Sequence, residues 1–125
     1  MSTPEEIVTE FCAGWSDPDP AALAAYFTED ATYHNIPMEP VQGREAIQAF
    51  IEGFLGAFEG IDFTIHRQVS VGNVVMNERT DVLRGAGKAT PLPVMGVFEL
   101  VDGKIAAWRD YFDLGAITAA FTAEE

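Results

Sequence analysis

The strongest constraint on the fold is the change of pattern at residue 61, where apolar residues at helical spacing give way to β-rich runs. Turn signals at Gly72-Asn73, Gly85–Gly87 and Asp102-Gly103 separate these runs, and the last of them is typical of a tight hairpin. The runs comprise Ile61–Val69, Val74–Leu83, Thr90–Val101 and Lys104–Phe112. Strands joined by such short turns pair antiparallel, so the second half of the chain is predicted to form a meander of long strands.

The first half of the chain is predicted to be mainly helical. Ser2 or Thr3 can cap a first helix, whose apolar face repeats at Ile7, Phe11 and Trp15. The other expected elements are a short helix from Pro20 through Phe27, a strand at Thr32–Ile36, a helix from Arg44 to about Phe58 and a closing amphipathic piece at Leu114–Phe121. Helices followed by a strand meander indicate an α+β fold, and we expect a single domain spanning residues 1–125.

Composition excludes several classes of partner. The chain has 20 acidic and 7 basic residues, and its formal net charge of −13 repels phosphate backbones and anionic lipid surfaces. We therefore expect neither a nucleic-acid partner nor a membrane partner. Cys12 is the single cysteine, so an internal disulfide and a thiolate metal site are excluded. No signal-peptide pattern is present at the N-terminus, and a cytoplasmic protein is the simplest expectation.

One predicted strand carries charges on its apolar face. Alternation along Val74–Leu83 places Asn77, Arg79 and Asp81 on the same side as Val75 and Leu83. If these two apolar residues face the core, Arg79 and Asp81 are buried with them. Buried charges persist only when they are paired and hydrogen-bonded, so an ion pair is expected here.

Two further strands place polar groups among apolar ones. In the last run, Asp110 shares a face with Trp108 and Phe112, and in the short early strand Tyr33 and Asn35 share a face. A structural ion pair without catalytic function remains an alternative. A register slip of one residue would turn Asp110 toward solvent.

Two carboxylates that share one guanidinium can differ in proton affinity. One of them can then act as an acid while the other acts as a base. Such a pair suits the addition of water across a strained bond. This chemistry requires no cofactor and no metal ion, and we expect neither.

The chain resembles the limonene-1,2-epoxide hydrolase family from about Tyr33 to Leu114. The resemblance rests on four blocks in matching order and spacing, YHNIP at 33–37, ERTDVL at 78–83, GVFE at 96–99 and WRDYFD at 108–113. It implies an NTF2-like cone, in which three to four α-helices wrap a curved mixed sheet, and commonly a homodimer. It also implies one-step hydrolysis of a small-molecule epoxide to a vicinal diol, without a covalent intermediate.

The resemblance also implies a role for each polar residue. Asp110 would be the general base that deprotonates a water molecule, which Tyr33 and Asn35 would also hold. Asp81 would be the general acid that protonates the epoxide oxygen. Arg79 would lie between the two aspartates and orient both.

The substrate pocket implied by the resemblance is largely apolar. Its expected lining is Trp15, Phe54, Phe58, Leu83, Val94, Phe112 and Ile117. Phe54 and Phe58 are bulkier than the aliphatic residues expected at these positions, which argues against limonene oxide as the preferred substrate. Plain core packing is the other interpretation of these aromatic residues.

Two other functions fit the same fold. An isomerase or cyclase would use an unpaired carboxylate base, whereas here Arg79 lies two residues from Asp81. A non-catalytic binder of apolar small molecules would have no need for two aspartates and an arginine in its pocket, since each costs desolvation.

Overall fold

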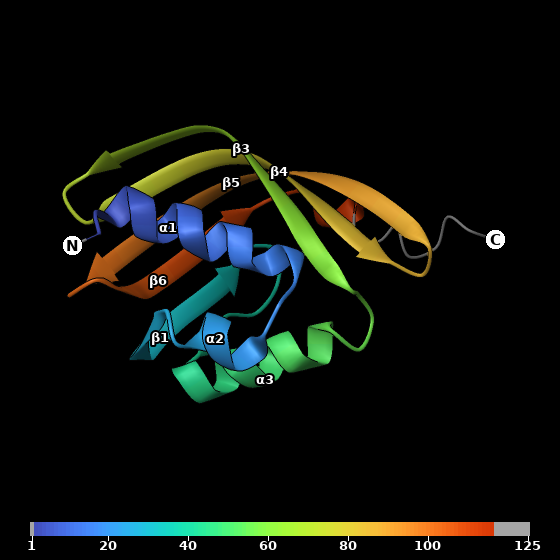
Figure 1. Ribbon diagram of the computed structural model, residues 1–125, viewed down its shortest axis with the longest axis horizontal. Coiled ribbons are helices and arrows are strands. Elements are labelled where there is room, and N and C mark those ends of the chain that lie inside the picture. The colour runs from blue at the N-terminus through green and yellow to red at the C-terminus, as the bar shows by residue number, and fades with distance from the viewer. Residues whose placement is uncertain (1, 117–125) are drawn as a thin grey trace.

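A computed structural model describes residues 2–116, which form one six-stranded mixed sheet in the order β2-β1-β6-β5-β4-β3 (Figure 1). The strands are β1 (Phe27–Asn35), β2 (Val41–Gln42), β3 (Gly60–Val71), β4 (Val74–Gly85), β5 (Lys88–Val101) and β6 (Lys104–Tyr111). The helices are α1 (Pro4–Ala13), the 3-10 turn η1 (Gly14–Ser16), α2 (Pro20–Ala24) and α3 (Arg44–Phe54). Strands β3 to β6 form the predicted antiparallel meander, whereas β1 pairs parallel with β6.

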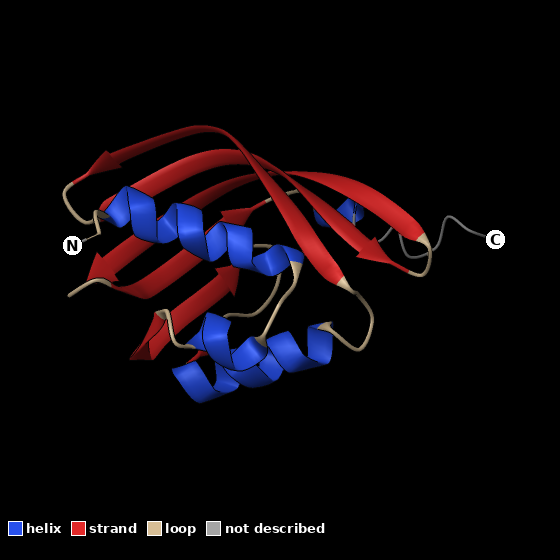
Figure 2. Cartoon of the chain, viewed as in Figure 1, coloured by secondary structure: helices blue, strands red, loops and turns tan. Residues whose placement is uncertain are grey.

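The helices lie against the curved sheet. Helix α1 runs across the longer strands, and α2 and α3 lie together next to β1 (Figures 1 and 2). Thr3 caps α1 as predicted, because its Oγ1 accepts a hydrogen bond from Glu6 N–H at 3.1 Å while Glu6 Oε1 accepts one from Thr3 N–H at 2.9 Å. Within the described residues, no helix has the length and apolar character needed to cross a lipid bilayer.

The structure moves two of the expected element boundaries. Phe27 begins β1 instead of ending α2, because it pairs with Ile105 of β6 and strand pairing outweighs helical spacing. Helix α3 ends at Phe54, before the expected Phe58, because Gly53 weakens its last turn and Glu59 N–H already bonds to the β4 carbonyl of Arg84. The short strand β2 had no sequence signal that we identified.

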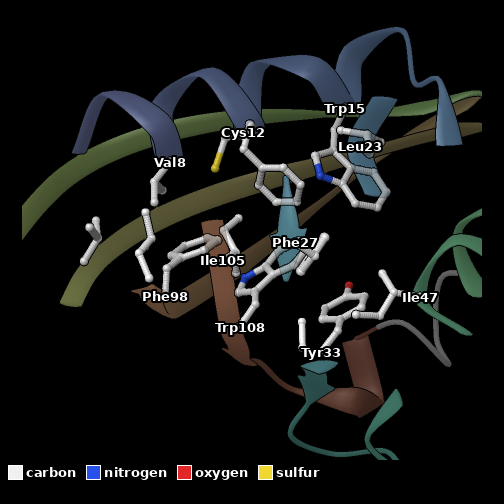
Figure 3. Packing of buried hydrophobic residues seen from close by; sticks show 14 of the residues in the cluster. Val8, Cys12, Trp15, Leu23, Phe27, Tyr33, Ile47, Phe98, Ile105 and Trp108 are labelled. Carbon is white, nitrogen blue, oxygen red and sulfur yellow. The ribbon is translucent and has the colours of Figure 1, made fainter. Parts of the chain in front are cut away.

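Aromatic packing between α1 and the sheet forms the centre of the core (Figure 3). Trp108 of β6 stacks on Tyr33 at 4.3 Å between ring centroids and on Phe98 at 5.3 Å, while Phe11 of α1 meets it edge-on at 5.0 Å. Such edge-on and offset contacts are the favoured geometries of aromatic pairs. The β6 face that carries Trp108 is therefore held firmly against α1 and β1.

Burial along the strands confirms the predicted faces. On β4, alternate residues from Val75 to Leu83 are buried, and this set includes Arg79 and Asp81. On β6, Trp108 and Asp110 are buried, while Tyr111 is exposed. Register then aligns polar residues across the sheet, because Gly96 of β5 pairs with Asn77 on one side and with Asp110 on the other.

Candidate active site

The Arg79 guanidinium connects the two buried aspartates. Its Nε and Nη2 donate to Asp81 Oδ1 and Oδ2 at 2.9 Å and 2.8 Å, and Nη2 also donates to Asp110 Oδ2 at 2.9 Å. The Arg79 side chain is fully buried, and both carboxylates are nearly so. Burial acts to lower the pKa of Arg79, but the neighbouring carboxylates outweigh it and hold the pKa above its ordinary value. The guanidinium therefore stays charged between its two partners.

Alternation along β4 and a glycine on β5 make this arrangement possible. Arg79 and Asp81 share a face because they are two residues apart on one strand. Arg79 reaches Asp110 on β6 by passing over β5, where Gly96 has no side chain. A Cβ at Gly96 would collide with Arg79 Nη1 and would lie 2.7 Å from Asp110 Oδ1. In the sequence, Gly96 stood out only as part of the GVFE block, although an interior strand glycine signals close approach of another group.

An aromatic ring covers one face of the guanidinium. Arg79 Cζ lies 4.6 Å from the centroid of the Phe63 ring of β3. This distance is within the range of a cation–π interaction, which is strongest where water is excluded. Phe63 thus stabilises a buried cation without competing for its N–H groups.

Asp110 has a second donor that sequence analysis missed. Trp108 Nε1 donates to Asp110 Oδ1 at 2.7 Å, so each carboxylate oxygen accepts one hydrogen bond from a buried side chain. Burial raises the pKa of Asp110 above its ordinary value, although the charge of Arg79 and the donors on both oxygens act in the opposite direction. The sequence placed Trp108 among the apolar core residues, and its indole N–H gave no separate signal.

Tyr33 and Asn35 complete the polar group from the β1 side. Tyr33 donates its hydroxyl proton to Asn35 Oδ1 at 3.3 Å, and Asn35 is the register partner of Asp110. Burial raises the pKa of Tyr33, so its phenol remains protonated and can donate a hydrogen bond. The structure thus brings together all five polar residues that the sequence selected.

A cavity of about 100 Å³ opens beside these residues. One water molecule needs about 10–15 Å³ of such space, so the cavity can hold a small organic molecule together with a water molecule. Four of the five polar residues line the cavity, and Arg79 lies behind them. The rest of the lining is apolar apart from ring N–H groups and consists of Trp15, Met38, Phe50, Phe54, Ile61, Phe63, Leu83, Leu92, Val94, Trp108 and Phe112.

Most of the predicted pocket residues take part in this lining. Trp15, Phe54, Leu83, Val94 and Phe112 line the cavity as expected. Phe58 is not among the residues that line this cavity, and its ring stacks on Phe54 at 4.6 Å between centroids. Ile117 lies outside the described residues.

Sequence analysis did not identify several apolar wall residues. Ile61 and Phe63 alternate along β3, and Phe50 of α3 packs against the hydrophobic core. Their periodicity shows that they face inward. It does not show which inward-facing residues border empty space, since that depends on how neighbouring elements pack.

Residues 8–108 match the family described as SnoaL-like domain. The chain belongs to this family. It is 32% identical over 107 residues to the epoxide hydrolase EphG of Mycobacterium tuberculosis, a match that covers 86% of this chain and 71% of the relative.

Solved structures support the same assignment. The chain is similar to an LEH-like epoxide hydrolase of M. tuberculosis, with a TM-score of 0.80 and 28% identity over 97% of this chain and 96% of the other. It is also similar to a Catenulispora acidiphila protein with a ketosteroid isomerase-like fold, with a TM-score of 0.83 and 26% identity over 94% and 92% of the two chains. These likenesses confirm the expected α+β fold of the NTF2-like type and the resemblance to epoxide hydrolases.

Proposed function

We propose that this protein hydrolyses a small, largely apolar epoxide to a vicinal diol in one step. The observation that carries the proposal is the Arg79 guanidinium, which binds Asp81 and Asp110 at 2.8–2.9 Å beside an apolar cavity that both aspartates line. The epoxide hydrolase relatives support the same reaction class. An acid and a base beside one substrate site are what the addition of water to a strained ring requires.

In the proposed reaction, Asp110 takes a proton from a water molecule that Tyr33 and Asn35 help to orient. The water oxygen forms a bond to one epoxide carbon while the bond between that carbon and the ring oxygen breaks. Asp81 gives its proton to the released oxygen, so the product is a neutral diol. A proton then returns from Asp110 to Asp81 before the next turnover. Arg79 stays charged throughout and holds the ionised carboxylate.

The cavity favours compact substrates over bulky ones. Phe54 forms part of its wall, and Phe58 and Trp15 pack against Phe54 with centroid distances of 4.6 Å and 6.3 Å. Because Phe54 packs against both rings, a shift of this part of the wall would break aromatic contacts. We therefore propose a cyclic epoxide smaller than limonene oxide as the better substrate.

The test is turnover of cyclohexene oxide and limonene oxide in oxygen-18 water. We expect a diol that carries one oxygen-18 atom, a higher kcat/KM for cyclohexene oxide, and no label in the protein carboxylates after a single turnover. Label in a carboxylate would refute direct attack by water. The absence of diol across a broad epoxide panel would refute the proposed function.

An isomerase or cyclase is the competing enzyme class, because a similar structure has a ketosteroid isomerase-like fold. Such an enzyme abstracts a proton from carbon and needs a free carboxylate base. Here both buried carboxylates pair with one guanidinium, so an acid and a base lie side by side and neither carboxylate stands alone. Exchange of substrate C–H for deuterium in heavy water, without diol formation, would favour that class.

We also propose that the protein is a homodimer that associates through the outer face of the sheet. Exposed apolar side chains gather there on neighbouring strands, and Val69 pairs with Met76 while Met95 pairs with Tyr111. The ion pair between Arg67 and Glu78 and the one between Arg109 and Glu99 are both 2.7 Å long and lie on this face. Apolar groups with polar neighbours are typical of a protein interface.

A further inference from the structure

Asn77 binds the guanidinium nitrogen that neither aspartate contacts. Nε and Nη2 of Arg79 donate to the aspartates, whereas Nη1 donates to Asn77 Oδ1 at 2.9 Å. Asn77 is 1% exposed, so this hydrogen bond is shielded from water. Arg79 is therefore held on three sides, by two charged acceptors and one neutral acceptor.

The other end of the Asn77 amide is also fixed. Its Nδ2 donates to Gln68 Oε1 of β3 at 3.0 Å, and Gln68 Nε2 donates to Thr9 Oγ1 of α1 at 3.0 Å. Rotation of the amide would break bonds at both ends, and unpaired buried polar groups are costly. This chain of amides therefore connects the position of Arg79 to α1.

Gly96 keeps open the space in which the Asn77 hydrogen bond lies. It is the register partner of Asn77, and a Cβ there would approach Asn77 Oδ1 to 3.1 Å while colliding with Arg79 Nη1. A side chain at this position would separate donor and acceptor. Strand pairing and the residue type at 96 thus both support the contact.

The described groups around the cluster of Arg79, Asp81 and Asp110 contribute no further charge. Cys12 faces it from α1, and burial raises the pKa of its thiol to about 12. Tyr33 faces it from β1, and burial raises the pKa of its phenol as well, so both are neutral near pH 7. Phe63 of β3 is apolar, and β5 contributes Gly96. The cluster consists of one cation, Arg79, and the two carboxylates of Asp81 and Asp110.

A buried cluster of one cation and two carboxylates is stabilised by taking up one proton, because that makes it neutral. In the proposed reaction, this is the proton that Asp81 gives to the epoxide oxygen in each turnover. A third carboxylate on Arg79 would add a negative charge and favour the uptake of a second proton. A neutral amide supplies the same acceptor geometry without that effect.

We propose that Asn77 is a positioning residue that orients Arg79 and limits the buried cluster to a single stored proton. The inference rests on the proposed function, in which Asp110 must be ionised while Asp81 carries the proton. An aspartate at position 77 would bring a second proton into the cluster, and three carboxylates would then share two protons, so that Asp110 would be ionised in only a fraction of the molecules.

The test is Asn77→Asp, which preserves the size of the side chain and changes its charge. We expect carbon-13 NMR of the aspartate carboxyl groups to show one more bound proton at pH 7 in this variant than in the wild type. We further expect the low-pH limb of the pH profile of kcat to move to higher pH by at least one unit. At pH 7, kcat should fall at least tenfold, while KM should stay within threefold of the wild-type value. Asn73→Asp makes the same change at an exposed position in the turn before β4 and should alter none of these values.

A second variant separates position from charge. Asn77→Leu removes the acceptor of Arg79 and adds no carboxylate, so kcat should fall at least tenfold while the proton count stays as in the wild type. An unchanged proton count and low-pH limb in Asn77→Asp would overturn the inference, and so would wild-type kcat in Asn77→Leu. The proton count needs no turnover. A wild-type protein without epoxide hydrolysis would therefore refute the proposed function, while the NMR result would still decide the role of Asn77.

Discussion

Asp81 and Asp110 share one guanidinium but differ in their other contacts. Asp81 receives two hydrogen bonds from Arg79, which is the bidentate geometry. Asp110 receives one from Arg79 and one from the neutral indole of Trp108. The two carboxylates therefore differ in their donors, because Asp110 alone accepts a hydrogen bond from a neutral group.

Replacing either aspartate by asparagine should stop the reaction and preserve the fold. Asp81→Asn and Asp110→Asn each leave Arg79 paired with the other carboxylate, so no buried charge is left alone. We expect kcat to fall by about 10²–10⁴-fold, the usual contribution of a general acid or base. Steady-state kinetics and thermal unfolding measure the two effects. Substantial activity in one of these variants would remove that aspartate from its proposed role.

The Trp108 donor should set the pH range of activity. The indole N–H stabilises the ionised form of Asp110, so Trp108→Phe should raise the pKa of Asp110 further. Because the base must be ionised, the low-pH limb of the kcat/KM profile should move to higher pH by about one to two units, as a lost hydrogen bond to a charged group is worth roughly 1.5–3 kcal/mol. A pH–rate profile measures the shift.

Trp15→Phe is the matched control for this prediction. Trp15 also lines the cavity, but within the described residues its Nε1 donates no hydrogen bond. Loss of that N–H should leave the low-pH limb in place. Equal shifts in both variants would show that a change in cavity volume, and not the donor to Asp110, moves the profile.

At the scale of elements, β5 separates the two strands that carry the charges. Arg79 on β4 and Asp110 on β6 are bridged only because the intervening strand has a glycine between them. The same strand carries Leu92 and Val94 on its inner face, where they line the cavity. One strand therefore supplies both the gap for the guanidinium and a wall of the pocket.

Gly96→Ala should destabilise the fold as well as the site. The added methyl group meets buried polar atoms, and overpacking of this kind costs about 1–3 kcal/mol. Urea unfolding measures the change in the free energy of unfolding. Gly53→Ala is the control, since its Cβ would enter open space on α3, and it should stabilise the fold by about 0.5–1 kcal/mol. A stability loss at Gly53 equal to that at Gly96 would contradict the steric explanation.

At the scale of the whole molecule, the two faces of the sheet differ in the side chains that they carry. The inner face carries the charged cluster and the cavity, and the outer face carries exposed apolar groups such as Val69 and Met95. Apolar groups on an otherwise acidic surface are costly to leave in water, which favours their burial against a second copy.

Met95→Lys should therefore convert a dimer into a monomer. The lysine would place a charge within the proposed interface, and buried unpaired charges are strongly disfavoured. Light scattering after gel filtration should give about 27 kDa for the wild type, twice the chain mass of 13.6 kDa, and about 13.6 kDa for the variant. Ala49→Lys on the exposed side of α3 should remain a dimer. A monomeric wild type would contradict the proposed association.

The sequence by itself determined which side chains share a face. Alternation along β4 placed Arg79 and Asp81 inward, and alternation along β6 did the same for Asp110, because the direction of a side chain in a strand is a local property. The α+β order of elements followed from local periodicity in the same way. The boundaries at Phe27 and Phe58 were wrong, because strand pairing and the start of β3 override local helical spacing there.

Only the tertiary structure decided which of these inward groups meet. Gly96 lies between Asn77 and Asp110 through strand register, and the Trp108 indole reaches Asp110 only in the packed core. Contacts between strands depend on residues distant in the chain, and the sequence pattern of one strand does not specify them. Local alternation thus predicted a buried charged pair, and sheet register made it a cluster with a neutral third acceptor and an adjoining cavity.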